Sequence, residues 1–524
     1  MKRRDFIRNA TSLIVLPGIG NVLMAGNSDP RPWFTALANA GETDRVLVLI
    51  QLRGGNDGLN TLIPLDQYAA YSNARKEVAI AQSAVLPLNG YENCGLHPSM
   101  TPLQKRFNEG KVRIVQAVGY PSPNFSHFRS TDIWLNASDS DEVITTGWAG
   151  RFLDTQYPGF PEGYPSTDMP DPLAIEVGSV LSAGFQGGEM NLSMSVSDPT
   201  NFYRLINGVQ DPAPDTPAGK ELAYVRITAQ QTNEYATVIM NAANQVSQQS
   251  TAYPEQGTNA VADQLKIVAR LIAGGLKTKV YLVSLGGFDT HNDQVDESDS
   301  SIGIHATLLN KLSVAIDAFM TDLDFLNIAN RVTGMTFSEF GRRIMANKSY
   351  GTDHGAAAPM ILFGNHVIPG ILGVNPTIPN VVNTNSNIPM QHDFRAVYAS
   401  LLNQWFKTDK SLVDAVLLKS FNTLPLIRSD ESAVPEIQPG NPGSFRNVPN
   451  PFSNETSIYF DSAGEDIIIE IYDAKGALRK TLTDSEFAPG SHAIVFQAGD
   501  LSAGIYYARM QKSGLRQTIA MIKN

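Results

Sequence analysis

Three runs dominated by apolar residues, separated by long stretches with helical spacing, constrain the fold of this 524-residue chain most strongly. The runs are Val46–Leu52, Val112–Val118 and Lys279–Leu285. Strands that are apolar at nearly every position are buried on both faces, which is typical of a parallel sheet covered by helices. Apolar residues three to four apart at 220–249, 260–276 and 302–328 predict such helices. The pattern predicts an α/β sandwich with a mostly parallel sheet.

The character of the chain changes after a Pro/Ser/Gly/Glu-rich connector at 426–447. From 448 to 524, short alternating segments are separated by turn sequences such as Ala474-Lys475-Gly476, which predicts a small immunoglobulin-like β-sandwich. We expect this part to be non-catalytic, because it contains one histidine, His492, and no nucleophile constellation. The expected domains are therefore an α/β domain at 44–425, the linker at 426–447, and the β-sandwich.

The first 26 residues have the pattern of an export signal. A basic segment with paired arginines, Lys2–Arg8, precedes a short apolar stretch, Leu13–Met24, and the small residues Ala25-Gly26. This arrangement is typical of a twin-arginine signal peptide, and a general secretory signal is the other export route. A basic N-terminal helix of a cytosolic protein is the alternative.

The net charge, the apolar pattern and the cysteine content argue against some classes of protein. The formal net charge of −11 argues against a nucleic-acid partner, which would require a basic surface. Past the N-terminus no run of eighteen apolar residues occurs, so we expect no transmembrane span in the mature chain. The single cysteine, Cys94, cannot form an internal disulfide, and we interpret it as structural.

Two glycine turns place acidic and histidine side chains directly after expected strands. Asp57 follows the first run within Gly54–Gly58, and Asp289 and His291 follow the third run after Gly286-Gly287. In open α/β sheets, sites form at the carboxyl ends of strands, so these side chains are candidate ligands.

A third candidate group lies between residues 331 and 370. The order here is a strand at Val332–Phe337, a turn, the residues Thr352-Asp353-His354-Gly355, a second strand at Met360–Phe363, and then His366. Two imidazoles and a carboxylate at strand ends suit a divalent metal of borderline softness. Alternatively, Asp353 caps a turn and His354 is a hydrogen-bonded surface histidine.

The segment Pro121–Phe128 leads into an expected helix at 129–135. Ser126 is expected at its N-cap or first turn, where free N–H groups favour an anion, and a purely capping serine is the alternative. His127 could donate a proton or contact an anion. Arginines that could bind ester oxygens bidentately are Arg53, Arg129 and Arg342.

Five motifs together resemble the domain-of-unknown-function family 1501. They are Leu52–Asn60, Ser126-His127-Phe128, Phe288–His291, Ser338–Arg342 and Thr352–Gly355. The resemblance covers roughly residues 44–410 and keeps the family's order. Because that family is placed in the alkaline phosphatase/sulfatase superfamily, the resemblance implies a three-layer α/β/α sandwich.

The resemblance also implies roles at the candidate site. Asp57 resembles the metal-binding aspartate beside the nucleophile, and Ser126 resembles the nucleophile itself. Metal-binding roles are implied for the pair Asp353 and His354, for Asp289 and His291 as a second group, and for His366 as a last ligand. The implied cofactor is one or two divalent ions, Zn, Mn or Ca.

The C-terminal part resembles a type IX secretion (Por) type A sorting domain. The residues that carry the resemblance are Val448–Phe452, Ile471–Gly476 and Leu501–Tyr506. The resemblance implies the type IX secretion machinery as a partner, after twin-arginine or general export. The implied location is the periplasm, then the cell surface or the extracellular space.

Two functions follow as hypotheses. The first is a metal-dependent hydrolase of anionic phosphate or sulfate esters, small or polymeric, with Ser126 or a metal-bound water as nucleophile and with Arg53 and His127 in catalytic roles. The second is a non-catalytic secreted or cell-surface binding protein on a decayed hydrolase fold. Hydrolysis requires Asp57, Ser126, Asp353 and His354 to converge. The excursion at 178–260 is expected to shape a substrate pocket.

Overall fold

The structure, a computed structural model, describes residues 44–178, 180–197, 234–428, 445–448, 450, 452–462, 464–473, 477–488, 490–512 and 515–523. The expected signal peptide at 1–26, part of the 178–260 excursion and residues 429–444 of the expected linker lie outside the described residues. The chain divides into two compact units, Met1–Asp430 and Glu431–Asn524, and each is described by itself.

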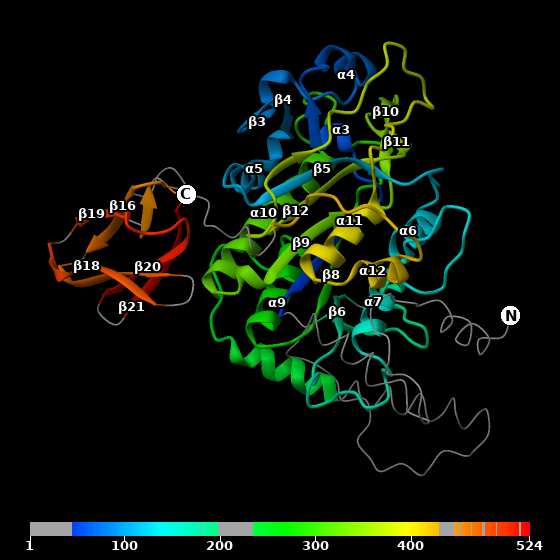
Figure 1. The fold of residues 1–524 in the computed structure, drawn as a ribbon. Coiled ribbons are helices and arrows are strands. Elements are labelled where there is room, and N and C mark those ends of the chain that lie inside the picture. Colours follow the sequence, from blue (N-terminus) through cyan, green and yellow to red (C-terminus); the bar gives the residue numbers. More distant parts are fainter. Residues whose placement is uncertain are drawn as a thin grey trace, which may run out of the picture. The chain divides into compact units, whose positions relative to one another are not determined.

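A nine-stranded sheet forms the centre of the first unit (Figure 1). The strand order is β13-β5-β12-β9-β1-β8-β6-β7, with β14 also paired to β5. The strands are β1 (Val46–Arg53), β5 (Val112–Gly119), β6 (Ala174–Val177), β7 (Ser193–Val196), β8 (Val280–Gly286), β9 (Val332–Phe337), β12 (Ala358–Phe363), β13 (Gly370–Leu372) and β14 (His392–Asp393). Every pairing is parallel except those of β12, which is antiparallel to β5 and β9. The predicted mostly parallel sheet is confirmed.

The two faces of β1 contribute to different hydrophobic cores. Val48 and Ile50 pack in a core with helices α5, α9 and α10, whereas Leu47 and Leu49 pack in a core with α6, α7, α11 and α12. The helices are α3 (Gly58–Thr61), α4 (Tyr68–Ala74), α5 (Thr101–Asn108), α6 (His127–Asn136), α7 (Trp148–Gln156), α9 (Ala260–Ala273), α10 (Ile304–Phe325), α11 (Phe394–Ser400) and α12 (Lys410–Leu417). Because successive side chains of a strand face opposite ways, this division produces the expected three layers.

Two smaller sheets accompany the central one. One is β3-β4-β2, made of β2 (Leu62–Pro64), β3 (Leu86–Leu88) and β4 (Tyr91–Leu96). The other is a ribbon of β10 (Gly341–Ala346) and β11 (Thr352–Gly355), in which Arg342 lies opposite His354. The Asp353-His354 pair therefore lies within a short strand, which the sequence pattern did not predict.

The second unit is a small antiparallel β domain, as predicted. One sheet contains β15 (Arg446–Val448), β16 (Glu455–Ser462) and β19 (Gly490–Gln497), and the other contains β18 (Leu478–Phe487), β17 (Glu465–Asp473), β20 (Gly504–Lys512) and β21 (Leu515–Lys523). Ile458, Ile469 and Phe496 come from both sheets and share one core.

Two further findings concern the start of the expected linker and the character of the helices. Leu426 and Ile427, at the start of the expected linker, are buried in the core of the first unit. Within the described residues, no helix combines the length and the apolar character that a membrane crossing requires.

Candidate metal centre

The loops that follow β1, β8 and β9 meet at one edge of the central sheet. The backbone N–H of Gly54 donates to Glu339 Oε1 at 2.8 Å. Gly54 has a φ of +121°, and a Cβ there would lie 2.2 Å from the backbone nitrogen of Asp289. Only glycine permits both this backbone conformation and this close approach. The glycine turn after β1 therefore brings Glu339 and Asp289 to the same edge.

Asp289 lies at the centre of a group of three histidines. Its Oδ1 is 3.0 Å from His354 Nε2 and 3.2 Å from His291 Nε2, and these two nitrogens are 2.9 Å apart. Its Oδ2 is 3.3 Å from His127 Nε2. The four side chains come from the loop after β8, from strand β11 and from the first residue of helix α6. Segments that are distant in the sequence thus direct nitrogen and oxygen donors toward one point.

Each of the three histidines is also held through its other ring nitrogen. The pairs are His127 Nδ1 with Glu339 Oε1 at 3.0 Å, His291 Nδ1 with Asp353 Oδ1 at 3.1 Å, and His354 Nδ1 with the Phe125 carbonyl at 2.8 Å. Carboxylate and carbonyl oxygens only accept, so each Nδ1 carries a hydrogen, and in its neutral form each ring presents the Nε2 lone pair on the side of Asp289. This arrangement is the usual support of metal-binding histidines.

The donor set fits a divalent metal ion. Ligand atoms that lie about 2.0–2.2 Å from a tetrahedral ion are roughly 3.3–3.6 Å from one another, and the distances between neighbouring donor atoms of this group, 2.9 to 3.3 Å, are slightly shorter. Two neutral imidazole lone pairs at this separation repel each other unless a cation or a proton lies between them. Nitrogen donors favour Zn or Mn over Ca.

Solvent reaches this group, because the side chains of Asp289 and His127 are 45% and 37% exposed. Burial alone would raise the pKa of Asp289, but the hydrogen bond and the positive charge of Arg342 outweigh it and hold that pKa below its usual value. Burial lowers the pKa of His354. An ionised carboxylate and a neutral imidazole are the protonation states that a metal requires.

Arg342 is fully buried and is engaged by the backbone of the site. Its guanidinium donates to the carbonyls of Gly55, Thr352 and Phe288 at 2.7–2.8 Å, to the Gly54 carbonyl, and to Asp289 Oδ1 at 2.8 Å. It therefore holds the site together, and its donors are directed inward rather than toward an ester.

Asp57 does not join the group around Asp289. Its side chain is 1% exposed, and its Oδ2 accepts hydrogen bonds from Arg75 and, at 2.6 Å, from Gln294 Nε2. The buried guanidinium of Arg75 neutralises the Asp57 carboxylate, which was expected to bind a metal. Convergence of Asp57 with Asp353 and His354 on one ion is not found.

His366 also lies away from the group, at the opposite edge of the sheet. Its ring is 5.5 Å from that of Trp405, whose indole N–H donates to the carbonyl of Val46, the first residue of β1. Because β12 runs antiparallel to its neighbours, the residues after it emerge where the parallel strands begin. Strand β1 has eight residues, so the two edges are roughly 25 Å apart.

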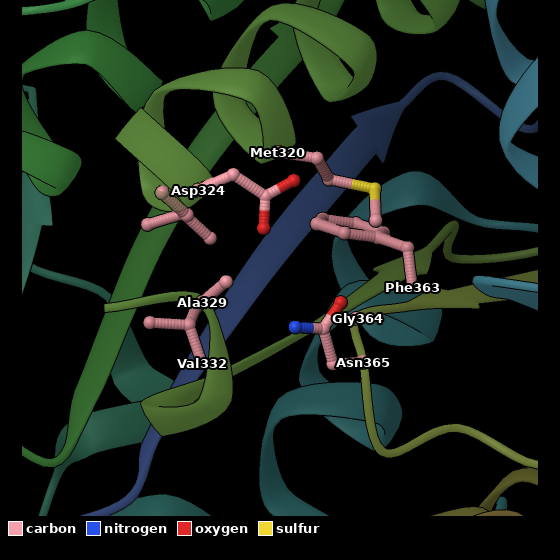
Figure 2. Close-up of a pocket in the computed structure, with 8 residues that line it drawn as sticks. Met320, Asp324, Ala329, Val332, Phe363, Gly364 and Asn365 are labelled. Carbon is pink, nitrogen blue, oxygen red and sulfur yellow. The ribbon is translucent and has the colours of Figure 1, made fainter. Parts of the chain in front are cut away.

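Figure 2 shows the pocket at this opposite edge, beside the end of β12. It is lined by Met320, Leu323, Asp324, Ala329, Val332, Phe363, Gly364 and Asn365. The lining is mainly apolar with Asp324 as its carboxylate, which is 3.3 Å from Lys111 Nζ. The pocket is therefore not a continuation of the histidine group.

Ser126 occupies the predicted N-cap of α6 but makes no side-chain capping hydrogen bond. It is exposed, and its two neighbours in the chain, Phe125 and His127, both contact the group. The capping hydrogen bond that the alternative requires is therefore not found. Of the arginines, Arg129 is bound to the carbonyls of the 139–142 loop, while Arg53 is 53% exposed and 3.9 Å from Glu176.

Glu339 is the contributor to the site to which sequence reasoning assigned no role. Its side chain is only 4% exposed, and it contacts both Gly54 and His127. A charged residue two positions after the buried strand β9 was the available signal, since a buried carboxylate requires specific partners.

Comparison with solved structures finds distant likenesses. A sulfatase from Pseudoalteromonas sp. is 10% identical, with 90% of this chain and 89% of that chain covered and a TM-score of 0.32. A protein of the alkaline phosphatase superfamily from Vibrio parahaemolyticus is 9% identical, with 84% and 82% covered and a TM-score of 0.30. A phosphonate monoester hydrolase from Silicibacter pomeroyi is 9% identical, with 91% and 89% covered and a TM-score of 0.30. Likenesses this distant carry no argument about chemistry.

Family models identify both parts of the chain. Residues 44–417 match the family described as "Protein of unknown function (DUF1501)", and residues 448–524 match the "Secretion system C-terminal sorting domain". No curated protein matches the sequence. The sorting domain indicates secretion to the cell surface or the extracellular space. The chain therefore belongs to the DUF1501 family and ends in a secretion system sorting domain.

Proposed function

We propose that the protein is a secreted, metal-dependent hydrolase of phosphate or sulfate esters. The observation that carries this proposal is the convergence of Asp289, His291 and His354, whose donor atoms lie 2.9–3.2 Å from one another while each histidine is held through Nδ1. Three protein ligands in a solvent-exposed position are typical of a catalytic metal site, which keeps one position open for substrate.

In this proposal, Asp289, His291 and His354 hold the ion, and His127 approaches it from the Oδ2 side of Asp289. Asp353 and Glu339 orient His291 and His127 through Nδ1. A bound divalent ion would supply Lewis acidity toward the ester oxygens. Asp57 and His366 have no ligand role in the proposed centre.

The remaining chemistry is assigned to residues at the rim. Ser126 is the proposed nucleophile, because its hydroxyl is free of a capping bond between two residues that contact the group. Arg53, half-exposed at the end of β1, would bind the anionic oxygens of the ester. Export through a twin-arginine or general signal at 1–26, followed by type IX secretion, would bring the enzyme through the periplasm to the cell surface or the medium.

Elemental analysis of the purified chain after supply of Zn, Mn and Ca tests the proposal. We expect metal in the wild type, loss in His354→Ala, and retention in His366→Gln, which removes a histidine from the opposite edge. The metal-loaded chain should then hydrolyse p-nitrophenyl phosphate or sulfate, and Ser126→Ala should not. Absence of metal from the wild type would refute the hydrolase and favour a binding protein on this fold.

A further inference from the structure

Gln294 connects the two segments that carry the proposed metal ligands. Its side chain is fully buried, and its Oε1 accepts hydrogen bonds from Thr290 Oγ1 at 3.1 Å and from Thr352 Oγ1 at 2.6 Å. Thr290 lies between Asp289 and His291, and Thr352 directly precedes Asp353 and His354. The backbone N–H of Thr352 also donates to the carbonyl of Thr290 at 3.1 Å.

Asp57 and Arg75 set the orientation of the Gln294 side-chain amide. Gln294 Nε2 donates to Asp57 Oδ2 at 2.6 Å, and the same oxygen forms the buried salt bridge with Arg75. Because a carboxylate only accepts, the amide must turn its NH2 group toward Asp57 and its oxygen toward the two threonine hydroxyls. The Arg75 guanidinium also donates to the carbonyls of Arg343 at 2.9 Å and Ile344 at 3.1 Å, on the strand paired with β11.

We infer that Gln294 is a positioning residue that sets the separation of the Asp289–His291 segment from the Thr352–His354 segment. The part of this inference that concerns metal affinity rests on the proposed function. The part that concerns the separation of the two segments does not. Metal sites tolerate ligand displacements of about 0.2 Å, so a link between the two ligand segments controls affinity without touching the ion. Asp57, which resembles a metal-binding aspartate, thus acts on the site through Gln294.

Isosteric substitutions test the link. Thr290→Val and Thr352→Val each remove one hydroxyl without changing the size of the side chain, and both are made in the full chain. A matched control is Thr333→Val, which changes a buried threonine at the start of β9 whose hydroxyl has no hydrogen-bond partner. Gln294→Leu removes the link itself.

Hydrogen exchange of the metal-free chain is the first readout. We expect each threonine variant to accelerate amide exchange about tenfold in both segments, 288–292 and 350–355. The control should leave both segments unchanged. In the Gln294→Leu background, Thr352→Val should add no further acceleration at 288–292, because the connection is already lost. Acceleration confined to the substituted segment would overturn the inference.

Metal affinity, measured by competition with a chromophoric chelator at a temperature well below unfolding, is the second readout. Thr352→Val and Gln294→Leu should weaken Zn or Mn binding about tenfold while the number of bound ions stays the same. A residue that supports stability alone would lower the melting temperature and leave this affinity unchanged. If the wild type binds no metal, the proposed function fails, and the exchange experiment still decides whether Gln294 couples the segments.

Discussion

Glu339 Oε1 and His127 Nδ1 lie 3.0 Å apart, although 212 residues separate them in the chain. The same oxygen accepts the backbone N–H of Gly54, so the nearly buried carboxylate joins the loops after β9 and β1 to the start of α6. One carboxylate thus fixes the ring of His127 and aims its Nε2 at Asp289.

Replacing the Glu339 carboxylate should lower metal affinity, and a substitution that removes the acceptor should lower it more than one that removes only the charge. Glu339→Ala removes the acceptor of His127, and we expect Zn or Mn affinity to fall roughly 10- to 100-fold. Glu339→Gln keeps an oxygen acceptor without the charge, so its affinity should lie between those of the alanine variant and the wild type. Titration calorimetry of the three proteins measures the order. Equal affinities for all three would show that Glu339 does not act on the site.

Substitutions of Asp353 and Asp289 should have different effects on metal binding. Asp353→Asn keeps a side chain that can accept from His291 Nδ1, so we expect one class of bound ion to remain, with affinity lowered about tenfold. Asp289→Ala removes the oxygens at the centre of the group and should abolish binding. Elemental analysis of dialysed protein distinguishes the two. Complete loss of metal in Asp353→Asn would make Asp353 a direct ligand.

Ser126→Ala should change activity without changing stability. Loss of a capping hydroxyl costs about 1 kcal/mol in most helices, but this hydroxyl makes no capping bond, so the free energy of unfolding should change by less than about 0.5 kcal/mol. Hydrolysis of a p-nitrophenyl ester should nevertheless disappear. Urea unfolding and the ester assay are both needed. A destabilised variant with normal turnover would restore the capping interpretation.

Arg342→Lys should destabilise the first unit strongly. The guanidinium is fully buried and donates to four backbone carbonyls and Asp289, and an ammonium group cannot reach all of them. Each unsatisfied buried group costs about 1–3 kcal/mol, so we expect a loss of roughly 3 kcal/mol or more. Arg129→Lys is the comparison, since Arg129 binds three carbonyls of a surface loop. Similar small effects of both substitutions in urea unfolding would contradict this account.

Two buried histidines predict a loss of stability in mild acid. Burial lowers the pKa of His97 to about 3 and that of His305 to about 4, while an unfolded histidine titrates near 6.5. As the pH falls below about 6.5, the unfolded chain takes up protons that the folded chain does not. Each histidine therefore lowers stability by about 1.4 kcal/mol per pH unit until its folded pKa is approached.

Unfolding by urea between pH 6.5 and pH 5 measures this slope. His305→Gln keeps a donor for Asn56 Oδ1 without a titrating ring, so its stability should depend less steeply on pH than that of the wild type. Parallel slopes for the two proteins would show that His305 does not contribute.

The fold and part of the site could be predicted because their signals are local. Apolar runs such as Val46–Leu52 indicate buried strands wherever their neighbours lie. Asp289 and His291 could be proposed as ligands because they follow a strand and a glycine turn, and His354 because Asp353-His354 is an adjacent pair of ligand side chains between two expected strands. These features depend on a few adjacent residues.

The placement of the other candidate residues depends on relationships that the sequence does not display locally. Asp57 follows a strand as a ligand would, but its partner Arg75 lies on the chain after α4, and nothing in the motif reveals the salt bridge. His366 follows a strand whose direction in the sheet is decided by pairing with β5 and β9. Asp353 and His354 are adjacent in β11, so their side chains leave opposite faces and engage different atoms of His291.

The reversed strand β12 also determines when the first unit can be completed. Strand β5, which leads toward His127, is joined to β9 and β1 only through β12, whose residues come more than 230 positions later. Until residues 358–363 have been synthesised, β5 pairs with no other strand of the sheet, because its remaining partners β13 and β14 come later still. Such late, non-local closure slows folding and exposes strand edges to other chains. A chain that stops before β12 should therefore aggregate, even though it already contains His127, Asp289, His291 and His354.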